Sequence, residues 1–384
     1  MLLLASRLPN SLYDGEDLRV HHFAKHLAEN NEVHFLGFGD SCAANETTSF
    51  FKTVQLVSDN HDMKAAERRS LTRCLSPAKL YPYNSRMQSA LSNMLGKTKF
   101  DVLWIPSWRM APYSEGMEDL PVVMDVMDDG VLELARELKG ARLGVNFTRK
   151  CKRLLVTWMF EKKYFSRASL CSFVTARDAD MFRRICPRTK IAVIPNGVDT
   201  HFYQPLGEVE EFPSLAFEGN MGFPPNVDAV CYFCRAIFPK ILKSIPAVKL
   251  FLVGKDPAPQ VRALQNCSVT VTGYVDDVRY YLDRATVFVC PMRKGAGIKN
   301  KMLQAWAMAK PVVATSLAVS GLQAIHMKNV LVANNPCGFS KAVLSLLDGS
   351  IDRKSLGFQA RRTAIDHYSW KAQVKLFESE LLSL

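Results

Sequence analysis

Two glycines and three lysines stand close together late in the sequence, within RKGAGIKNK. Gly295 and Gly297 follow the short apolar run 287–291, and Lys299 and Lys301 lie where an apolar pattern of helical spacing begins. A glycine loop that joins a buried strand to a helix N-terminus suits an anion, because backbone N–H groups point outward there and glycine permits close approach. A lysine at that end of a helix opposes the helix dipole, and a bound diphosphate would account for it. An ordinary connecting loop is the alternative.

Carboxylates gather at the end of another predicted strand. The apolar run 121–125 ends in Asp125 and continues into Val-Met-Asp-Asp-Gly, which brings Asp128 and Asp129 close to it. Like charges placed together are costly unless water or a ligand compensates them. The residues leave two interpretations open, solvated loop acids or groups that act on a substrate.

Patterns typical of metal sites are weak. His22 and His26 lie four residues apart on a predicted helix, but no third ligand is evident, which favours a solvated helix face. Cys231 and Cys234 have no second Cys or His pair at zinc spacing, which favours core packing. We therefore expect no metal site.

Length and composition indicate a globular protein of two domains. The 384 residues, 48% hydrophobic and 22% charged, suffice for two cores. No apolar run approaches the ~20 residues of a membrane helix, and residues 1–5 are too short for the core of a secretory signal. Ten cysteines, several within apolar strands, predict a reduced, cytoplasmic protein. The formal net charge of +12 implies anionic partners.

Apolar runs alternate with helical patterns along the sequence, which predicts an α/β protein with parallel sheets. Strand 1–5, a loop with Gly15, a helix and strand 32–38 form the opening of a Rossmann-like unit. A second opening follows the proline and glycine punctuation of residues 195–207. We predict a first domain over 1–204, a second over 205–366 and a final helix over 367–384.

Residues 139–167 are densely basic with apolar residues interleaved. This pattern is typical of an amphipathic helix that rests on an anionic membrane surface. A helix that packs on the core and exposes a solvated basic face is the alternative.

The stretch 295–315, GAGIKNKMLQAWAMAKPVVAT, resembles the donor-site signature of retaining, nucleotide-sugar-dependent glycosyltransferases of the GT-B fold (group 1, or family 4, type). Within that family it most resembles the branch associated with bacterial exopolysaccharide clusters. The resemblance covers nearly the whole chain and is strongest over 191–322. It implies two facing Rossmann-like domains and a C-terminal helix that crosses back to the first.

The resemblance also implies a donor site. The backbone amides of Gly295, Ala296 and Gly297, together with Lys299 and Lys301, would hold the diphosphate, and Lys299 would help to stabilise it as it departs. The further donor-site residues that the resemblance implies are Gly15, Arg19, Gly219, Asn220, Tyr274 and Val275. For the glycines, Asn220 and the turn at 273–275, a structural turn is the alternative.

This sequence departs from the wider family at two kinds of position. Many relatives carry two glutamates eight residues apart, where this chain has Ala296 and Gln304. Relatives usually have a glutamate at position 304 that binds the ribose hydroxyls. Gln304 replaces its charge-assisted hydrogen bond with a neutral one, which should cost about 1 kcal/mol of binding free energy. Where many relatives carry a sugar-contacting histidine, this chain has Met127 followed by Asp128. We therefore expect Asp128 first, and Asp125 second, to contact sugar or acceptor hydroxyls.

The function implied by the resemblance is transfer of a sugar from a nucleoside diphosphate sugar to a hydroxyl of a glycan or lipid-linked acceptor, with retention (a hexosyltransferase type). No cofactor other than this co-substrate and no metal is implied, and the enzyme would act in the cytoplasm or at the inner face of the membrane. One alternative is a non-catalytic nucleotide-sugar or polyanion-binding protein. Another is a glycosyltransferase whose acceptor is a nucleic acid. The basic segment matches no recognised nucleic-acid-binding module, which argues against this alternative.

Overall fold

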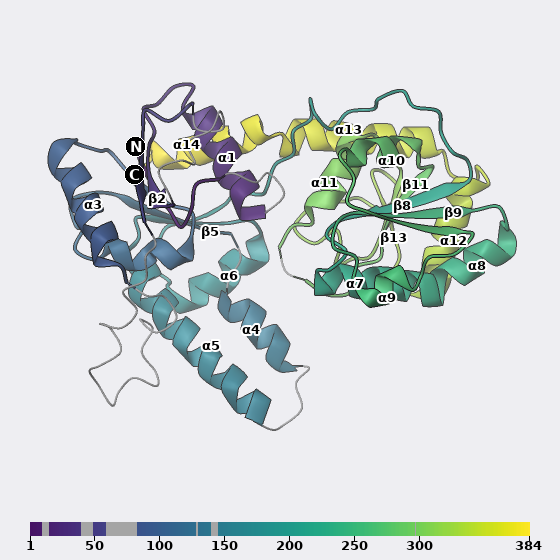
Figure 1. Cartoon of the computed structure of the whole chain (residues 1–384), viewed down its shortest axis with the longest axis horizontal. Coiled ribbons are helices and arrows are strands. Elements are labelled where there is room, and N and C mark those ends of the chain that lie inside the picture. The colour runs from purple at the N-terminus through teal and green to yellow at the C-terminus, as the bar shows by residue number, and fades with distance from the viewer. Residues whose placement is uncertain (10–14, 40–48, 59–82, 128–129, 140–144, 296) are drawn as a thin grey trace. The chain divides into compact units, whose positions relative to one another are not determined.

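The computed structural model describes residues 1–9, 15–39, 49–58, 83–127, 130–139, 145–295 and 297–384 (Figure 1). The chain forms two compact units. Unit 1 comprises Met1–Pro195 with Val374–Leu384, and unit 2 comprises Asn196–Gln373. The boundaries expected from the sequence, 204/205 and 366/367, differ from the divisions at 195/196 and 373/374 by nine and seven residues.

Unit 1 is built on a seven-stranded sheet in the order β3-β2-β1-β4-β5-β6-β7, and its strands pair in parallel. The strands are β1 (Leu2–Ala5), β2 (His34–Phe38), β3 (Thr53–Val57), β4 (Leu103–Ile105), β5 (Val122–Met127), β6 (Leu170–Phe173) and β7 (Ile191–Val193). The strand order reverses between β1 and β4, which makes this pair the topological switch point. Strand β3 was not predicted. It is an edge strand with exposed positions and lacks the continuous apolar run of a central parallel strand.

Helices cover this sheet, and the final helix of the chain belongs to it. The helices of unit 1 are α1 (Gly15–Leu27), α3 (Ser85–Lys97), η5 (Trp108–Ser114), α4 (Gly130–Lys139), α5 (Val145–Tyr164), η6 (Phe165–Arg167) and α6 (Ala176–Ile185), with α14 (Trp370–Leu381) returning from unit 2. Phe377 of α14 is fully buried, with its ring 5.3 Å from that of Phe23 and 5.5 Å from that of Trp104. The predicted return of the last helix to the first domain is thus confirmed.

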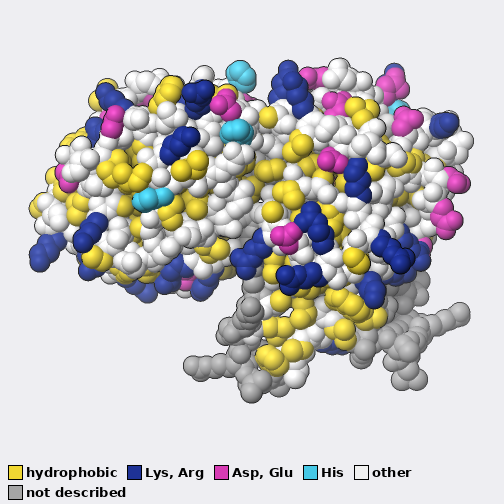
Figure 2. Space-filling model, turned by 180° about the vertical axis from the view of Figure 1, so that it is seen from behind, with side chains coloured by type: hydrophobic (Ala, Val, Ile, Leu, Met, Phe, Trp, Pro, Cys, Tyr) yellow, Lys and Arg dark blue, Asp and Glu magenta, His cyan; other side chains and the backbone are white. Residues whose placement is uncertain are grey.

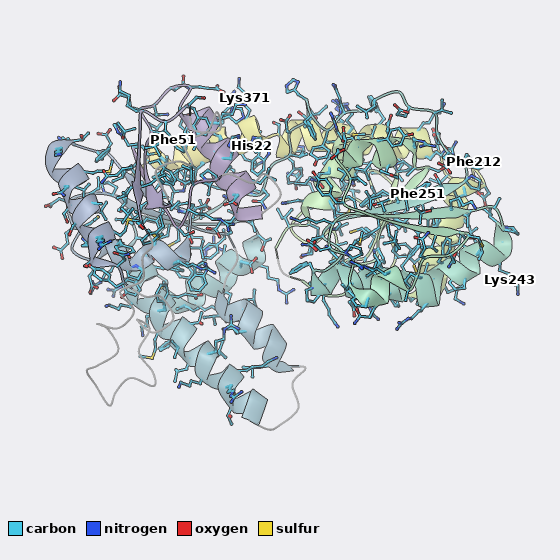
Figure 3. The ribbon with its side chains drawn as sticks, viewed as in Figure 1. His22, Phe51, Phe212, Lys243, Phe251 and Lys371 are labelled. Carbon is cyan, nitrogen blue, oxygen red and sulfur yellow. The ribbon has the colours of Figure 1, made fainter. Side chains whose placement is uncertain are left out.

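Unit 2 is built on a six-stranded parallel sheet in the order β10-β9-β8-β11-β12-β13. The strands are β8 (Ser214–Glu218), β9 (Lys249–Val253), β10 (Val269–Gly273), β11 (Val287–Cys290), β12 (Val312–Ala314) and β13 (Leu331–Val332). Here the strand order reverses between β8 and β11. Figure 3 shows the side chains that fill the space between this sheet and its helices, with Phe251 on β9 and Lys243 at the outer end of α8.

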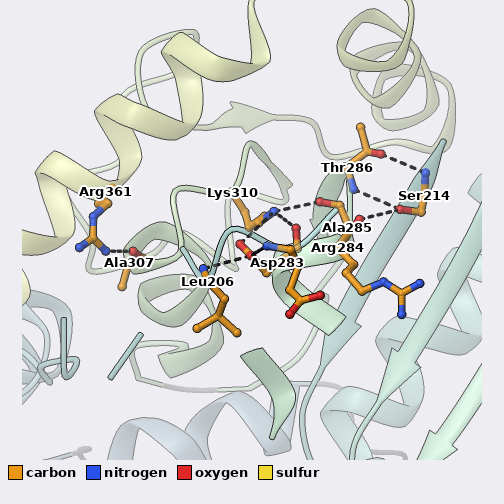
Figure 4. Close-up of polar contacts among 10 residues, drawn as sticks. Leu206, Ser214, Asp283, Arg284, Ala285, Thr286, Ala307, Lys310 and Arg361 are labelled. Carbon is orange, nitrogen blue, oxygen red and sulfur yellow. Dashed lines mark hydrogen bonds and ion pairs between the residues drawn. The ribbon is translucent and has the colours of Figure 1, made fainter. Parts of the chain in front are cut away.

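The helices of unit 2 are α7 (Pro224–Tyr232), η7 (Phe233–Ile237), α8 (Phe238–Ser244), α9 (Pro259–Arg262), α10 (Val278–Arg284), α11 (Asn300–Ala307), α12 (Pro336–Leu347) and α13 (Arg353–Tyr368). Polar contacts fix the end of α11 to its neighbours (Figure 4). Lys310 donates to the backbone oxygens of Asp283 and Ala285, and Arg361 of α13 donates to the backbone oxygen of Ala307. Helix α11, which follows the glycine loop, is therefore held firmly on the sheet. The α/β fold with two Rossmann-like sheets agrees with the sequence prediction.

Candidate functional site

The switch point of unit 2 lies at the carboxyl ends of β8 and β11. These strands pair in register through Val287 with Leu215 and Phe288 with Ala216, so that their last residues, Glu218 and Cys290, end side by side. Open α/β sheets bind ligands in the crevice outside such ends. The glycine loop leaves β11 here, which places the predicted phosphate loop at the switch point.

The loop needs its glycines. Gly295 has a φ of 109° and Gly297 a φ of 62°, which are conformations that other L-residues rarely adopt. Lys299 is buried at the N-cap of α11, and its Nζ donates to the backbone oxygen of Gly297 over 2.7 Å. Lys299 therefore braces the loop, and binding of a donor phosphate by it stays a prediction. Ala296 lies outside the described residues.

Lys301 is the cation of this site that is least engaged. Its Nζ lies over the Phe217 ring at 5.0 Å and against Gly219, where an added Cβ would come within 2.6 Å of it. Within the described part of the chain, its ammonium makes no hydrogen bond or ion pair. An ammonium in this state beside a glycine at a switch point is available to an anionic ligand.

The loop after β8 is a tight turn. Asn220 Oδ1 accepts a hydrogen bond from Gly222 N over 2.8 Å, and Asn226 Nδ2 donates to the backbone oxygen of Asn220 over 2.9 Å. Gly219 has a φ of 145°, and a Cβ on the neighbouring Gly254 would lie 1.9 Å from Gly219 O. These contacts account for Gly219 and Asn220 as turn residues, and their proximity to Lys301 keeps the donor-binding prediction in place.

Gln304 is bound to a residue that sequence reasoning missed. Its Nε2 donates to Tyr203 Oη over 2.8 Å. Burial raises the pKa of the Tyr203 phenol, and the negative charge of Glu218 raises that pKa further. Tyr203 lies 101 residues before Gln304 in the sequence, so no local pattern could have paired them.

Glu218 was also missed. It is 8% exposed at the end of β8, and burial raises the pKa of its carboxyl above the ordinary 4.5, while Lys301 acts in the opposite direction. The signal available in the sequence was a glutamate inside the apolar run SLAFEG, directly before a glycine. A charge in that position requires a reason.

Other charges near the glycine loop are taken up by partners. Asp228 of α7 forms ion pairs with Arg293 at 2.9 Å and with Lys294 at 3.0 Å. Burial acts to raise the Asp228 pKa, but the two cations together bring that pKa below its ordinary value. The first two cations of the loop therefore hold it to α7.

The predicted nucleobase contacts lie farther along the same sheet edge. Strand β10 ends in Gly273, and Tyr274 after it is 62% exposed, with Val275 half-buried. Strand β9 separates β10 from β8. The role of these two residues stays a prediction.

In unit 1 the predicted site residues Arg19 and Asp125 are bound to each other. Arg19 Nε and Nη2 donate to the two Asp125 carboxylate oxygens over 2.7 and 3.0 Å, and Ser172 Oγ donates to Asp125 Oδ1 over 2.6 Å. Arg19 also donates to Pro195 O over 3.1 Å, and both charged side chains are completely buried. This geometry favours a structural ion pair over contact with a diphosphate or a sugar hydroxyl.

The remaining predictions in unit 1 concern its loops. Gly15 is exposed as the first residue of α1, and Asp128 lies outside the described residues. His26 Nδ1 is 2.7 Å from Glu29 Oε1, and burial raises the Cys234 pKa to about 12. Among the residues with described positions, no group of three or more His, Cys, Asp or Glu side chains is placed to hold a metal.

Two family models match the chain in succession. One, described as "Glycosyltransferase Family 4", matches residues 14–202, and one described as "Glycosyl transferases group 1" matches residues 212–349. A relative described as an uncharacterised 44.6 kDa protein in the cps region of Klebsiella pneumoniae is 24% identical over 175 residues, which are 43% of this chain and 44% of that protein. The chain therefore matches less than half of that relative's length.

Solved structures are similar over the whole chain. Sucrose-phosphate synthase from Thermosynechococcus elongatus has a TM-score of 0.72 and 15% identity, covering 100% of this chain and 99% of its own. HepE from Anabaena in complex with UDP has a TM-score of 0.69 and 15% identity, with the same coverage. At this identity the likeness shows the fold. With one family model on each half and this fold throughout, the chain belongs to the glycosyltransferases of the GT-B fold.

Proposed function

We propose that the protein transfers a sugar from a nucleoside diphosphate sugar to a hydroxyl group of a glycan or lipid-linked acceptor, with retention at the anomeric carbon. The observation that carries the proposal is the available Lys301 ammonium beside the glycine loop at the switch point of unit 2. A fixed cation and outward-facing amides suit a diphosphate. The HepE complexes with UDP and with UDP-glucose support this ligand class.

In this proposal the protein acts mainly through electrostatics. Lys301 and the loop amides of Gly295 and Gly297 stabilise the negative charge that develops on the departing diphosphate. Lys299 keeps the loop in shape through its bond to Gly297 O. The departing phosphate helps to remove the acceptor proton, and fixed cations supply the charge that a metal would otherwise supply.

The donor is tested by thermal shift. UDP, GDP, ADP and their sugar conjugates are each added to the protein, and one of them should raise the melting temperature, because a ligand that binds only the folded state stabilises it. Lys301→Ala should abolish that rise. Lys243→Ala, which removes an exposed lysine from the far end of α8, should keep it.

Activity is tested separately with the donor so identified. Release of nucleoside diphosphate, and retention seen by NMR of the glycoside formed, would support transfer. Binding without release above background would instead favour the non-catalytic binder. The resembled exopolysaccharide branch and the relative from a cps region make glycan and lipid-linked hydroxyls the first acceptors to assay.

We also propose that α5 rests on an anionic membrane surface. Exposed apolar side chains on this helix, Leu155, Trp158 and Met159, lie among the exposed cations Lys152 and Lys162. Figure 2 shows apolar side chains gathered on this part of unit 1 with Lys and Arg nearby. No described helix is long and apolar enough to cross a bilayer. This arrangement suits an interfacial helix.

Vesicle pelleting tests this contact. The protein should pellet with phosphatidylglycerol vesicles and remain in solution with phosphatidylcholine vesicles, because the cations require anionic lipid. Trp158→Ala combined with Leu155→Ala should release it. Retention on DNA that falls steeply with salt, without vesicle binding, would favour the nucleic-acid acceptor instead.

A further inference from the structure

Glu218 is a buried carboxylate that the fold itself does not use. It is 8% exposed, and among the residues that the structure describes, its side chain forms no hydrogen bond and no ion pair. Burial without hydrogen bonds disfavours the charged form. A carboxylate kept in such a place is a candidate for ligand contact.

Its location points to the same site as the glycine loop. Glu218 is the last residue of β8, directly before Gly219 and beside the end of β11. The negative charge of Glu218 acts to raise the pKa of Tyr203, and the positive charge of Lys301 acts to lower the pKa of Glu218. Lys301 and Glu218 therefore lie near one another at the switch point without forming an ion pair.

Two other acids of unit 2, Asp277 and Asp228, are engaged in ion pairs. Asp277 binds the Arg279 guanidinium, with contacts of 2.6 and 3.0 Å, and Asp228 binds Arg293 and Lys294. Neither is available to a ligand without breaking an ion pair. Unlike these two acids, Glu218 could bind a ligand without breaking an ion pair.

The groups around Glu218 suit hydroxyls. A carboxylate accepts hydrogen bonds and repels phosphate, and the Tyr203 phenol and Gln304 amide can each donate and accept. Gln304 Nε2 is bound to Tyr203, which leaves its side-chain oxygen as a second acceptor. When Lys301 holds the diphosphate of a nucleoside diphosphate sugar, the hydroxyls of its ribose or its sugar would come close to Glu218, Tyr203 and Gln304.

We propose that Glu218 is a specificity-determining residue that accepts hydrogen bonds from hydroxyl groups of the nucleoside diphosphate sugar. This inference rests on the proposed donor. The hydroxyls belong either to the ribose or to the transferred sugar, and the same chemistry applies to both. A hydrogen bond to a charged acceptor is strong, and a ligand that lacks the donor leaves the carboxylate buried and unpaired.

The test measures dissociation constants by calorimetry for Glu218→Gln, the unaltered protein and the control Glu208→Gln, which removes an exposed charge from the same unit. The probes are UDP, GDP and ADP, their 2′,3′-dideoxy forms, their sugar conjugates and inorganic pyrophosphate. Glu218→Gln should weaken the sugar conjugate about tenfold or more. It should leave pyrophosphate binding unchanged, and Glu208→Gln should match the unaltered protein throughout.

The probes locate the hydroxyl. If it is on the ribose, the loss also occurs with the nucleoside diphosphate and disappears with its dideoxy form. If it is on the sugar, the loss occurs only with the conjugate. Dideoxy and conjugate probes on the unaltered protein show whether these hydroxyls contribute to binding at all, and if they contribute nothing the inference fails whether or not the variant folds.

Other outcomes overturn the inference. An equal loss with pyrophosphate would show that Glu218 only positions Lys301, and unchanged affinities for every probe would show that it touches no ligand. If the unaltered protein binds none of the nucleotides, the proposed function fails and the inference falls with it. If that protein binds one of them and Glu218→Gln binds it equally well, the inference alone fails.

Discussion

The two units of this molecule treat their buried charges in opposite ways. In unit 1, Arg19 and Asp125 are completely buried and bound to each other. In unit 2, Lys301 and Glu218 lie near each other but form no ion pair, and within the described residues neither makes a side-chain hydrogen bond. Both sheets are parallel and both strand orders reverse at one pair. The topology is therefore shared, and the pairing of the charges distinguishes a structural pair from a candidate binding site.

The difference teaches how to interpret charged residues at strand ends. In a buried ion pair, the attraction between the two charges offsets the cost of removing them from water. Removing one partner leaves the other charge buried and uncompensated. Where two opposite charges lie near each other without forming an ion pair, the fold leaves both available, and a ligand can bind to them. The comparison therefore predicts that mutation of Arg19 or Asp125 mainly lowers stability, while mutation of Lys301 or Glu218 mainly weakens ligand binding.

The largest effect is expected for Asp125→Ala. Removal of the carboxylate leaves Arg19 buried without its partner, which should lower the free energy of unfolding by about 3–5 kcal/mol. Urea unfolding followed by circular dichroism measures this loss. The double variant Arg19→Met with Asp125→Leu should recover most of it. A variant Asp125→Ala of normal stability that has lost transfer activity would restore Asp125 as a sugar contact.

Lys301→Ala should have the next largest effect, on affinity. Loss of a charged hydrogen bond to the diphosphate should weaken donor binding by about 1.5–3 kcal/mol, while the unfolding free energy stays nearly unchanged. Calorimetry and urea unfolding on the same preparation check both quantities. A large loss of stability would mean that Lys301 resembles Arg19, and the contrast between the units would fail.

Gly295→Ala tests the loop backbone. Its φ of 109° is strained for alanine, which should cost about 1–2 kcal/mol of stability and also weaken the donor. Gly116 in unit 1 has a φ of 84° with open space around it, and makes a matched control. Gly116→Ala should lose similar stability and keep full donor affinity. Equal affinity in both variants would argue against a phosphate loop.

The smallest effect concerns pH. Burial raises the pKa of Glu218 in the folded protein, so the fold favours the neutral carboxyl. The stability that the neutral form contributes is fully present below the unfolded pKa near 4.5 and is lost as pH rises through the folded pKa. Glu218→Gln removes that loss. The variant should be more stable than the unaltered protein at pH 7, and the difference should narrow toward pH 4.5. Melting temperatures measured across this range provide the check, and parallel curves would contradict it.

The sequence predicted the fold well because its signals are local. The buried strands read as apolar runs, and the glycine loop between β11 and α11 lies where the pattern placed it. Strand β3 escaped because an edge strand shows a weak pattern. The likeness of residues 295–315 to a donor signature predicted a donor site in unit 2, and both the site and its ligand contacts remain predictions.

What the sequence could not show is which charges meet. Arg19 and Asp125 are 106 residues apart, and each alone looked like a site residue. Tyr203 and Gln304 are 101 residues apart. Glu218 lies inside an apolar strand, where its burial depends on the whole sheet. Partner choice over such distances follows from the folded topology, which local patterns do not contain.

The return of α14 to unit 1 has a consequence during synthesis. Phe377 closes an aromatic cluster with Phe23 and Trp104, and Glu378 accepts from Asn31 over 2.9 Å. The ribosome makes these partners hundreds of residues apart. Unit 2 has all of its residues once Gln373 has emerged, whereas the first unit to be started waits for the helix that follows. Unit 1 therefore cannot complete its core until the whole of unit 2 has been synthesised.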